Sequence, residues 1–307
     1  MIVVAGEALI DRIGTPDGQL VDVPGGGPYN VAITIARLGG RVAFLGRLST
    51  DADGVLLRSR LVADGVDLQL TVSTDDPTPI ASARLDDDGS ATYTFEVEGS
   101  AAAGLVLDDL PGGLPAETTA LHVGTLGLVV EPMATTIEAL VRSAGSDVLV
   151  MLDLNCRPGA IADPAAYRAR IDRVLARTDI VKASVEDLAY LRPGVEALQA
   201  ASDVLELGPP AVLVTDGPRP VRILSGEGVI ELPIPPMRVV DTVGAGDAFG
   251  GGFLSAWIGA GMLRSDADRR EALESATALA IVVAGLTTTR AGAEPPAAAE
   301  VSELASR

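Results

Sequence analysis

The chain has 307 residues, a length that allows one large hydrophobic core or two modest ones, and its acidic residues outnumber its basic residues by 42 to 23. The resulting net charge of −19 repels phosphate backbones, so nucleic acid is not an expected partner. The single cysteine disfavours disulfide scaffolds and thiolate zinc clusters, and the single histidine, without a Gly-x-Ser-x-Gly elbow, disfavours a Ser-His-Asp hydrolase. With no basic leader and no uninterrupted apolar run of membrane-spanning length, the sequence disfavours secretion and membrane insertion and predicts a cytoplasmic protein.

Short β-branched runs alternate with Ala- and Leu-rich stretches along most of the chain. This alternation is typical of βαβ units and predicts an α/β fold with a mostly parallel sheet. The expected strands are residues 2–5, 42–45, 121–123, 148–152, 180–181 and 212–215.

The segment Gly6-Glu7-Ala8-Leu9-Ile10-Asp11 is expected to end the first strand. Because α/β folds bind ligands at the carboxyl ends of their strands, the carboxylate of Asp11 is a candidate acceptor for ligand hydroxyl groups. The alternative is a turn carboxylate with no binding role.

A glycine-rich segment follows, Gly25-Gly26-Gly27-Pro28-Tyr29-Asn30-Val31-Ala32, and leads into an expected helix. Its exposed backbone and the amide of Asn30 offer hydrogen bonds to several hydroxyls of a polyol. Taken alone, the segment is more often an ordinary helix entry with Pro28 near the first helical position.

Two hairpins are expected. Residues 80–97 alternate around Asp86-Asp87-Asp88-Gly89 and are expected to lie outside the main sheet. Residues 221–224 and 229–232 predict a second hairpin near the end of the sheet. Helices are expected at 248–258 and 269–286, and the residues after Gly292 are predicted to form a short extension.

The segment Asp153-Leu154-Asn155-Cys156-Arg157-Pro158 ends another expected strand. It offers Asn155 and Arg157 to the same crevice as Asp11. A surface ion pair is the commoner role of an arginine, so this assignment needs support from elsewhere in the chain.

The most informative segment is Asp241-Thr242-Val243-Gly244-Ala245-Gly246-Asp247-Ala248-Phe249. Small residues let a ligand approach the backbone, and the following helix directs its free N–H groups and positive dipole end at the same point, which predicts an anion hole. Asp247, in the first turn, is placed to accept the proton of an attacking hydroxyl. The alternative is a tight turn in which Asp247 only caps the helix, and the second glycine-rich segment near the N-terminus favours the catalytic interpretation.

With both glycine-rich segments in this order and separation, the chain resembles the ribokinase/PfkB carbohydrate kinase family from Gly6 to about Gly292, most of all its fructokinases and 2-keto-3-deoxygluconate kinases. The resemblance implies one kinase domain over residues 1–307, with a three-layer αβα ribokinase-like fold, a mostly parallel central sheet and a small β lid contributed mainly by residues 80–97. It also implies transfer of the γ-phosphoryl group of ATP, with Mg²⁺, to a hydroxyl of a small carbohydrate. Because lid sheets in this family often pair, we expect a homodimer.

The resemblance assigns Asp247 as the catalytic base and implies an anion hole made by Gly244, Ala245 and Gly246. On the sugar side it implicates Asp11, Gly26, Gly27, Asn30 and Arg157. On the nucleotide side it implicates Ser184, Thr215 and Gly217. The carboxylate of Asp241 and the backbone oxygens of Asp241 and Val243 match positions that hold a monovalent cation such as K⁺.

The chain departs from ribokinases in two places. Ser184-Val185-Glu186-Asp187 replaces an Asn-x-x-Glu element, so Glu186 and Asp187 both remain candidates for orienting metal-bound water. Pro28 replaces a lysine after the glycine pair, which disfavours ribose. Fructose is the favoured sugar, and 2-keto-3-deoxygluconate is the alternative because Arg157, or Arg84 in the lid, would pair with its carboxylate.

Other classes lack their motifs. A nicotinamide-dependent oxidoreductase requires Gly-x-Gly-x-x-Gly directly after the first strand, where Gly6-Glu7-Ala8 stands instead. The P-loop motif is absent around Lys182, the only lysine. A non-catalytic sugar-binding protein on the same fold is a further alternative, and the intact Asp247 argues against it.

Overall fold

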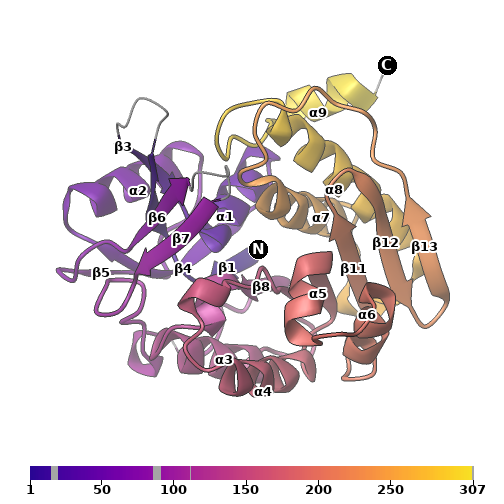
Figure 1. Cartoon of the computed structure of the whole chain (residues 1–307), viewed down its shortest axis with the longest axis horizontal. Coiled ribbons are helices and arrows are strands. Elements are labelled where there is room, and N and C mark those ends of the chain that lie inside the picture. Colours follow the sequence, from indigo (N-terminus) through magenta and orange to yellow (C-terminus); the bar gives the residue numbers. More distant parts are fainter. Residues whose placement is uncertain (15–19, 86–90, 111, 306–307) are drawn as a thin grey trace.

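The computed structural model describes residues 1–14, 20–85, 91–110 and 112–305 (Figure 1). The strands of its main sheet are β1 (Ile2–Ala5), β4 (Val42–Ser49), β5 (Thr71–Thr74), β8 (Ala120–Gly124), β9 (Leu149–Asp153), β10 (Ile180–Ser184), β11 (Ala211–Asp216), β12 (Arg219–Ser225) and β13 (Gly228–Leu232). They lie in the order β13-β12-β11-β10-β9-β8-β1-β4-β5. Neighbours from β5 to β11 run parallel, and the hairpin β12-β13 is antiparallel, so the predicted mostly parallel sheet and second hairpin are confirmed.

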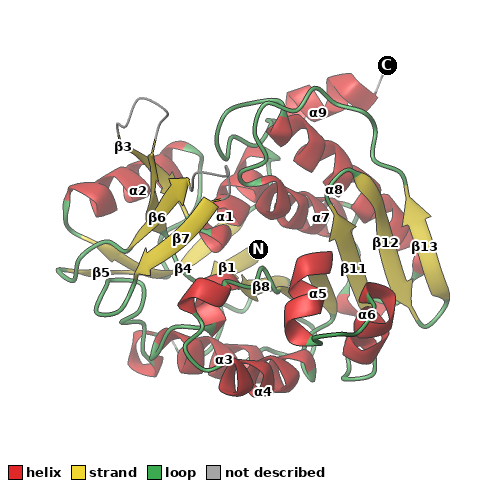
Figure 2. Ribbon diagram, viewed as in Figure 1, coloured by secondary structure: helices red, strands yellow, loops and turns green. Residues whose placement is uncertain are grey.

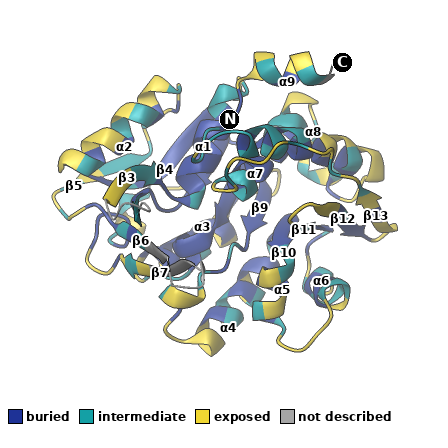
Figure 3. Ribbon diagram, turned by 45° about the horizontal axis from the view of Figure 1, so that its top comes forward, coloured by how far each residue is buried: buried dark blue, intermediate teal, exposed yellow. Residues whose placement is uncertain are grey.

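Helices cover both faces of this sheet and produce three layers (Figure 2). One face packs against α1 (Gly27–Arg37), α2 (Ala52–Ala63), α7 (Ala245–Gly259) and α8 (Arg270–Thr288). The other packs against α3 (Met133–Ser143), α4 (Pro164–Leu175), α5 (Val185–Leu191) and α6 (Ala197–Leu205). Successive strand residues alternate between the two faces, and the central strands are buried throughout (Figure 3).

A second, four-stranded sheet lies beside the main one in the described residues. Its strands are β2 (Leu9–Gly14), β3 (Leu20–Gly25), β6 (Ile80–Leu85) and β7 (Ala91–Glu96), in the order β3-β2-β6-β7. The hairpin predicted at 80–97 is present as β6 and β7, while its expected turn at Asp86–Gly89 lies outside the described residues.

The expectation that Asp11 ends the first strand is wrong. β1 ends at Ala5, and Asp11 lies within β2 of the second sheet. The chain leaves the main sheet at Gly6, whose φ of +149° and close approach to Pro28 leave no room for a side chain. Asp11 therefore belongs to the second sheet and not to the main one.

Helix α8 is long and apolar enough, by length and composition, to cross a membrane. In this fold it is a core helix that packs along α7, with Leu273, Ala280 and Val283 buried. The tail predicted as a short extension continues into helix α9 (Ala298–Ala305).

Candidate active site

The two glycine-rich segments meet where α1 and α7 begin. The two helices pack against each other, and Nδ2 of Asn30 donates to Oδ2 of Asp247 at 2.8 Å. Both side chains are buried, with exposed fractions of 7% and 8%. The structure thus brings the candidate sugar-binding amide and the candidate base into direct contact.

The first turn of α7 has the geometry of an anion site. Gly244 adopts a left-handed φ of +74°, and a Cβ there would lie 2.5 Å from the Cβ of Ala293, so only glycine fits. Ala245 donates its N–H to the carbonyl of Thr242 at 3.2 Å. The N–H groups of Gly246 and Asp247 have no acceptor within the described residues, so they and the positive end of the helix are available to an anion.

Burial raises the pKa of Asp247 to about 7. The hydrogen bond from Asn30 opposes this rise, and the carboxylate of Asp153 adds to it. The nearby cations Lys182 and Arg157 lower the pKa in turn. A carboxyl group that titrates near neutral pH is well matched to a general base.

Asp11 is the candidate sugar-binding carboxylate of β2. It lies so close to Gly25 of the neighbouring strand β3 that a Cβ on Gly25 would lie 2.0 Å from Oδ2 of Asp11. Gly26, at φ +109°, precedes α1, and Gly27 is its first residue. A Cβ on Gly27 would lie 3.4 Å from Oδ1 of Asp247. A side chain at Gly25 would therefore collide with Asp11, and one at Gly27 would crowd Asp247.

Arg157 places a positive charge near the carboxylates of Asp11 and Asp247. It follows β9, and its guanidinium donates to the carbonyls of Asn155 at 3.3 Å and Cys156 at 3.2 Å. Burial raises the pKa of Asp11 to about 6, and Arg157 opposes that rise. Since Arg157 also lowers the pKa of Asp247, it lies within electrostatic reach of both carboxylates.

Glu7 and Thr125, which share a hydrogen bond next to Gly27, were not assigned from the sequence. Glu7 is 1% exposed and accepts hydrogen bonds from the Thr125 hydroxyl and, at 3.0 Å, from the N–H of Gly127. Thr125 has a φ of +51° and lies directly behind Gly27. Burial raises the pKa of Glu7 to about 7. Glu7 stands in the motif that contains Asp11, whereas nothing in the sequence marks Thr125.

The candidate nucleotide side lies at the carboxyl ends of β10 and β11, where Ser184 pairs with Thr215 in register. Ser184 caps α5 by accepting the N–H of Asp187 at 3.1 Å. The oxygens of Asp187 accept N–H groups from Ser184 at 2.8 Å and Cys156 at 2.6 Å, while Glu186 is exposed without a partner in the described residues. Gly217 turns the chain from β11 to β12 with a φ of +54°.

Asp241, in the loop before α7, forms hydrogen bonds within its own loop and to the loop that follows α8. One carboxylate oxygen accepts the N–H of Val243 at 3.0 Å, and the other accepts the N–H of Gly292 at 2.8 Å. Each oxygen retains a free lone pair for a cation.

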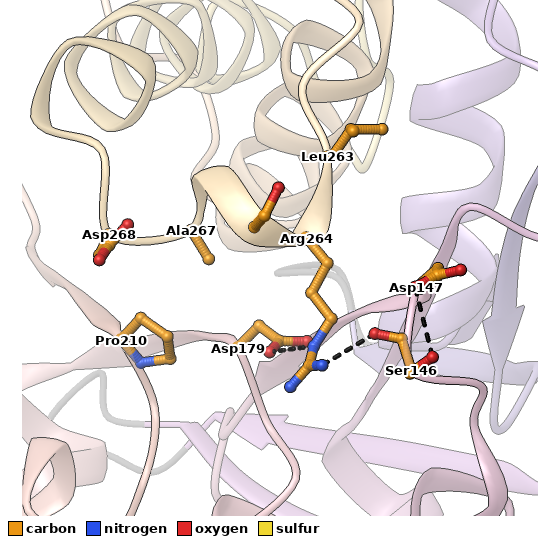
Figure 4. A pocket seen from close by; sticks show the side chains of 9 residues that line it. Ser146, Asp147, Asp179, Pro210, Leu263, Arg264, Ala267 and Asp268 are labelled. Carbon is orange, nitrogen blue, oxygen red and sulfur yellow. Dashed lines mark hydrogen bonds and ion pairs between the residues drawn. The ribbon is translucent and has the colours of Figure 1, made fainter.

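A cavity of about 380 Å³ lies at the opposite, amino-terminal edge of the sheet (Figure 4). Its arginine, Arg264, donates to Asp179 and to the carbonyl of Ser146, each at 2.8 Å. Because this cavity is remote from the strand ends that hold Asp153 and Ser184, it is not part of the candidate active site.

Comparison with known proteins adds an independent finding. The family profile described as pfkB family carbohydrate kinase matches residues 1–298. A fructokinase of Rhizobium leguminosarum bv. trifolii is 36% identical over 260 residues, which cover 83% of this chain and 79% of that protein. A fructokinase from Xylella fastidiosa with bound ATP superposes with a TM-score of 0.92 at 28% identity, covering 99% of this chain and 98% of that one. A double-mutant fructokinase from Vibrio cholerae, in a form with fructose, ADP and potassium ion bound, gives a TM-score of 0.87 at 28% identity and covers 98% of this chain and 97% of that one.

Proposed function

Because this chain belongs to the pfkB family of carbohydrate kinases, we propose that it transfers the γ-phosphoryl group of ATP to a hydroxyl of fructose. It is an ATP-dependent phosphotransferase that acts on a sugar hydroxyl, as the family and its ATP-bound relative indicate. The observation that carries the proposal is the buried contact between Asn30 and Asp247 beside the free N–H groups of α7.

Asp247 is the proposed catalytic base. Its Oδ2 is held by Asn30, and Oδ1 faces the space in front of Gly27, where a sugar hydroxyl would bind. When ionised, this carboxylate accepts the hydroxyl proton as the oxygen attacks the γ-phosphorus, and the P–O bond to ADP breaks. Its pKa of about 7 leaves much of the base ionised near neutral pH.

The N-terminus of α7 is the proposed anion hole. Negative charge spreads over the phosphoryl oxygens during transfer, and the unpaired N–H groups of Gly246 and Asp247 are fixed before that charge develops. Gly244 shapes the turn, and the half-buried Thr215 and the exposed Gly217 are the proposed nucleotide contacts.

The choice of fructose is supported by the fructokinase relatives and by the donors around the sugar space. Asp11 accepts from hydroxyls, and Asn30, Arg157 and the backbone at Gly26 and Gly27 complete the proposed contacts. The alternative acceptor is 2-keto-3-deoxygluconate, whose carboxylate would pair with Arg157. The side chain of Arg84, the other candidate for that role, lies outside the described residues.

The nucleotide side fits a Mg²⁺ ion that is held mainly by phosphates. In the described part of the chain no three Asp, Glu, His or Cys side chains group to hold an ion alone, and Mg²⁺ commonly uses one or two carboxylates, waters and substrate phosphates. Because Asp187 is buried and caps α5, whereas Glu186 is exposed and has no partner in the described residues, we assign Glu186 to orient metal-bound water. The ion, when bound, neutralises charge on the transferring phosphates.

A K⁺ ion is the proposed occupant beside Asp241. Its carboxylate keeps free lone pairs, and carboxylate and carbonyl oxygens are hard ligands. A relative was solved with potassium ion bound, which agrees with this assignment.

We propose that the second sheet is a lid on a single kinase domain of residues 1–307, because it contributes Asp11 and flanks Gly26.

We also propose a homodimer. The edge strand β3 of the second sheet exposes Leu20 (67%) and Val21 (44%), which suit a contact between two copies of the chain. Sedimentation at micromolar concentration tests the dimer, and a monomer mass would contradict it. A cytoplasmic location is part of the same proposal.

A sugar panel tests the function. Purified protein is incubated with MgATP and fructose, 2-keto-3-deoxygluconate, ribose or no sugar, and ADP formation is followed by a coupled enzyme assay. We expect the highest kcat/KM with fructose. Preference for 2-keto-3-deoxygluconate would replace the substrate assignment, and sugar binding without ADP formation would indicate a non-catalytic sugar-binding protein.

A further inference from the structure

A buried ion pair lies directly beneath the anion hole. Asp153 ends β9 and Lys182 lies opposite it in the register of β10. Nζ of Lys182 donates to the two carboxylate oxygens of Asp153 at 3.0 and 2.9 Å. Their side chains are only 5% and 1% exposed.

The ammonium touches the first turn of α7. A Cβ built on Gly246 would lie 2.9 Å from Nζ of Lys182, so the absence of a side chain at this position lets the ammonium approach the backbone. The N–H group of Gly246 has no acceptor within the described residues and is available to an anion. The charge of Lys182 also acts on the base, because it lowers the pKa of Asp247.

Stability alone does not account for the pair. Removing two charges from water costs several kcal/mol per ion, and well-packed apolar residues often replace a buried pair without loss. Two residues earlier in each strand, the same face of β9 and β10 carries the apolar residues Met151 and Ile180. The position of the pair under the anion hole suggests an electrostatic role, because a fixed cation stabilises developing negative charge most strongly where water is excluded.

We propose that Lys182 is a positioning residue for phosphoryl transfer, held by Asp153 beneath Gly246 so that its ammonium adds fixed positive charge to the anion hole. This inference rests on the proposed kinase function. Lys182 acts through the backbone of Gly246 and the carboxylate of Asp247, so its loss is expected to lower kcat rather than to weaken sugar binding.

A double variant separates a role in catalysis from a role in packing. Lys182→Met removes the charge at similar length but leaves Asp153 buried without its partner, which lowers stability. Lys182→Met combined with Asp153→Asn removes both charges and is expected to recover melting temperature. If Lys182 serves the anion hole, kcat of the double variant stays at least about 100-fold below wild type with KM for fructose within about threefold. Lys182→Arg, which keeps the charge, is expected to retain more kcat than either.

A matched control uses the cavity at the far edge of the sheet (Figure 4). Arg264 also pairs with a buried carboxylate, that of Asp179, which is 3% exposed and keeps a second partner in Arg177 at 3.1 Å. Arg264→Met is therefore expected to lower melting temperature modestly, without changing kcat by more than about twofold.

Recovery of kcat together with melting temperature in the double variant would overturn the proposal and make the pair structural, as would a Lys182→Met variant that keeps more than about a third of wild-type kcat. If Lys182→Met alone does not fold, the double variant and Lys182→Arg still decide. Absence of ADP formation by the wild-type protein with every sugar would instead refute the proposed function, and is thereby distinguished from failure of this inference.

Discussion

The side-chain amide of Asn30 donates a hydrogen bond to the carboxylate of Asp247 at 2.8 Å and so joins two residues that are 217 positions apart. The bond engages Oδ2 and leaves Oδ1 facing Gly27. Since an amide cannot take the proton that a base must accept, Asn30 orients Asp247 and favours its charged form. This one contact thus links the proposed sugar-binding segment to the proposed anion hole.

Replacing Asn30 with Leu is expected to move the pH profile. The substitution removes a bond that lowers the pKa of Asp247, so that pKa rises and the base stays protonated to higher pH. A hydrogen bond to a charged group is worth about 1.5 to 3 kcal/mol, so kcat/KM near neutral pH should fall about 10- to 100-fold. The measurement is kcat/KM for fructose across pH, whose acid limb should shift upward.

Thr34→Val is the control for Asn30. Thr34 lies one turn further along α1, is buried, and donates to the carbonyl of Asn30 at 2.8 Å without touching Asp247. Its loss should lower stability modestly and leave the acid limb in place. An unshifted limb in Asn30→Leu would contradict the orienting role.

Glu7→Gln is expected to change how stability depends on pH. Burial raises the pKa of Glu7 from 4.5 to about 7 in the folded protein. The folded state therefore binds more protons than the unfolded state between these values, and this group's contribution makes the wild type less stable as pH rises through that window. Gln does not ionise, so the variant should gain up to about 3 kcal/mol relative to wild type between acidic pH and about pH 8. Urea unfolding of both proteins at the two pH values measures this difference. If the difference in unfolding free energy between the variant and the wild type does not grow with pH, ionisation of Glu7 does not destabilise the folded protein and the prediction is wrong.

Much of this architecture follows from local sequence. The β-branched runs predict the parallel strands because buried strands need such residues, and the glycines before Asn30 and Asp247 predict helix entries that leave backbone exposed. The contact between these entries needs tertiary packing of α1 on α7, which no local pattern specifies. Resemblance to a family was needed to place both segments in one site.

The position of Asp11 and the pairing of Lys182 with Asp153 could not be predicted from the sequence, for physical reasons. The sequence predicts Asp11 at the end of the first strand, where α/β folds bind ligands, whereas the turn at Gly6 carries it into the second sheet. The pairing of Lys182 with Asp153 depends on the order and register of β9 and β10, and sequence periodicity does not fix either. Single charged residues in strands carry no signal of their partners.

Potassium dependence tests the assignment of Asp241. At constant ionic strength, replacing choline chloride by KCl should raise activity severalfold, because K⁺ would bind the carboxylate and nearby carbonyl oxygens beside the anion hole. Asp241→Asn keeps an acceptor for one backbone N–H but loses the charge, so the response to K⁺ should largely disappear. NaCl is the matched salt control. Equal activity in all three salts would remove the K⁺ proposal.

Asp247→Asn is expected to abolish most turnover while leaving the fold intact. Asn keeps the size and one acceptor but cannot take a proton, and loss of a general base typically costs about 10²- to 10⁴-fold in rate. Burial raises the pKa of Asp247 from 3.8 to about 7, so the folded state binds the extra proton between these values and the ionised group destabilises the protein above that window. Replacing it should therefore not lower the melting temperature at about pH 8, although the helix loses a favourable charge worth about 0.3 to 1 kcal/mol near its N-terminus.

The measurements for Asp247→Asn are kcat with saturating fructose, fructose binding by calorimetry, and melting temperature at about pH 8. If Asp247 only caps α7, kcat will change little and stability will carry the effect. If it is the base, kcat will fall at least about 100-fold while fructose binding and melting temperature stay close to wild type. The wild-type acid limb near pH 7 should also vanish from the residual activity of the variant, because the group that titrates there is gone. A variant that retains more than about a tenth of wild-type kcat would refute the assignment of Asp247 as the base.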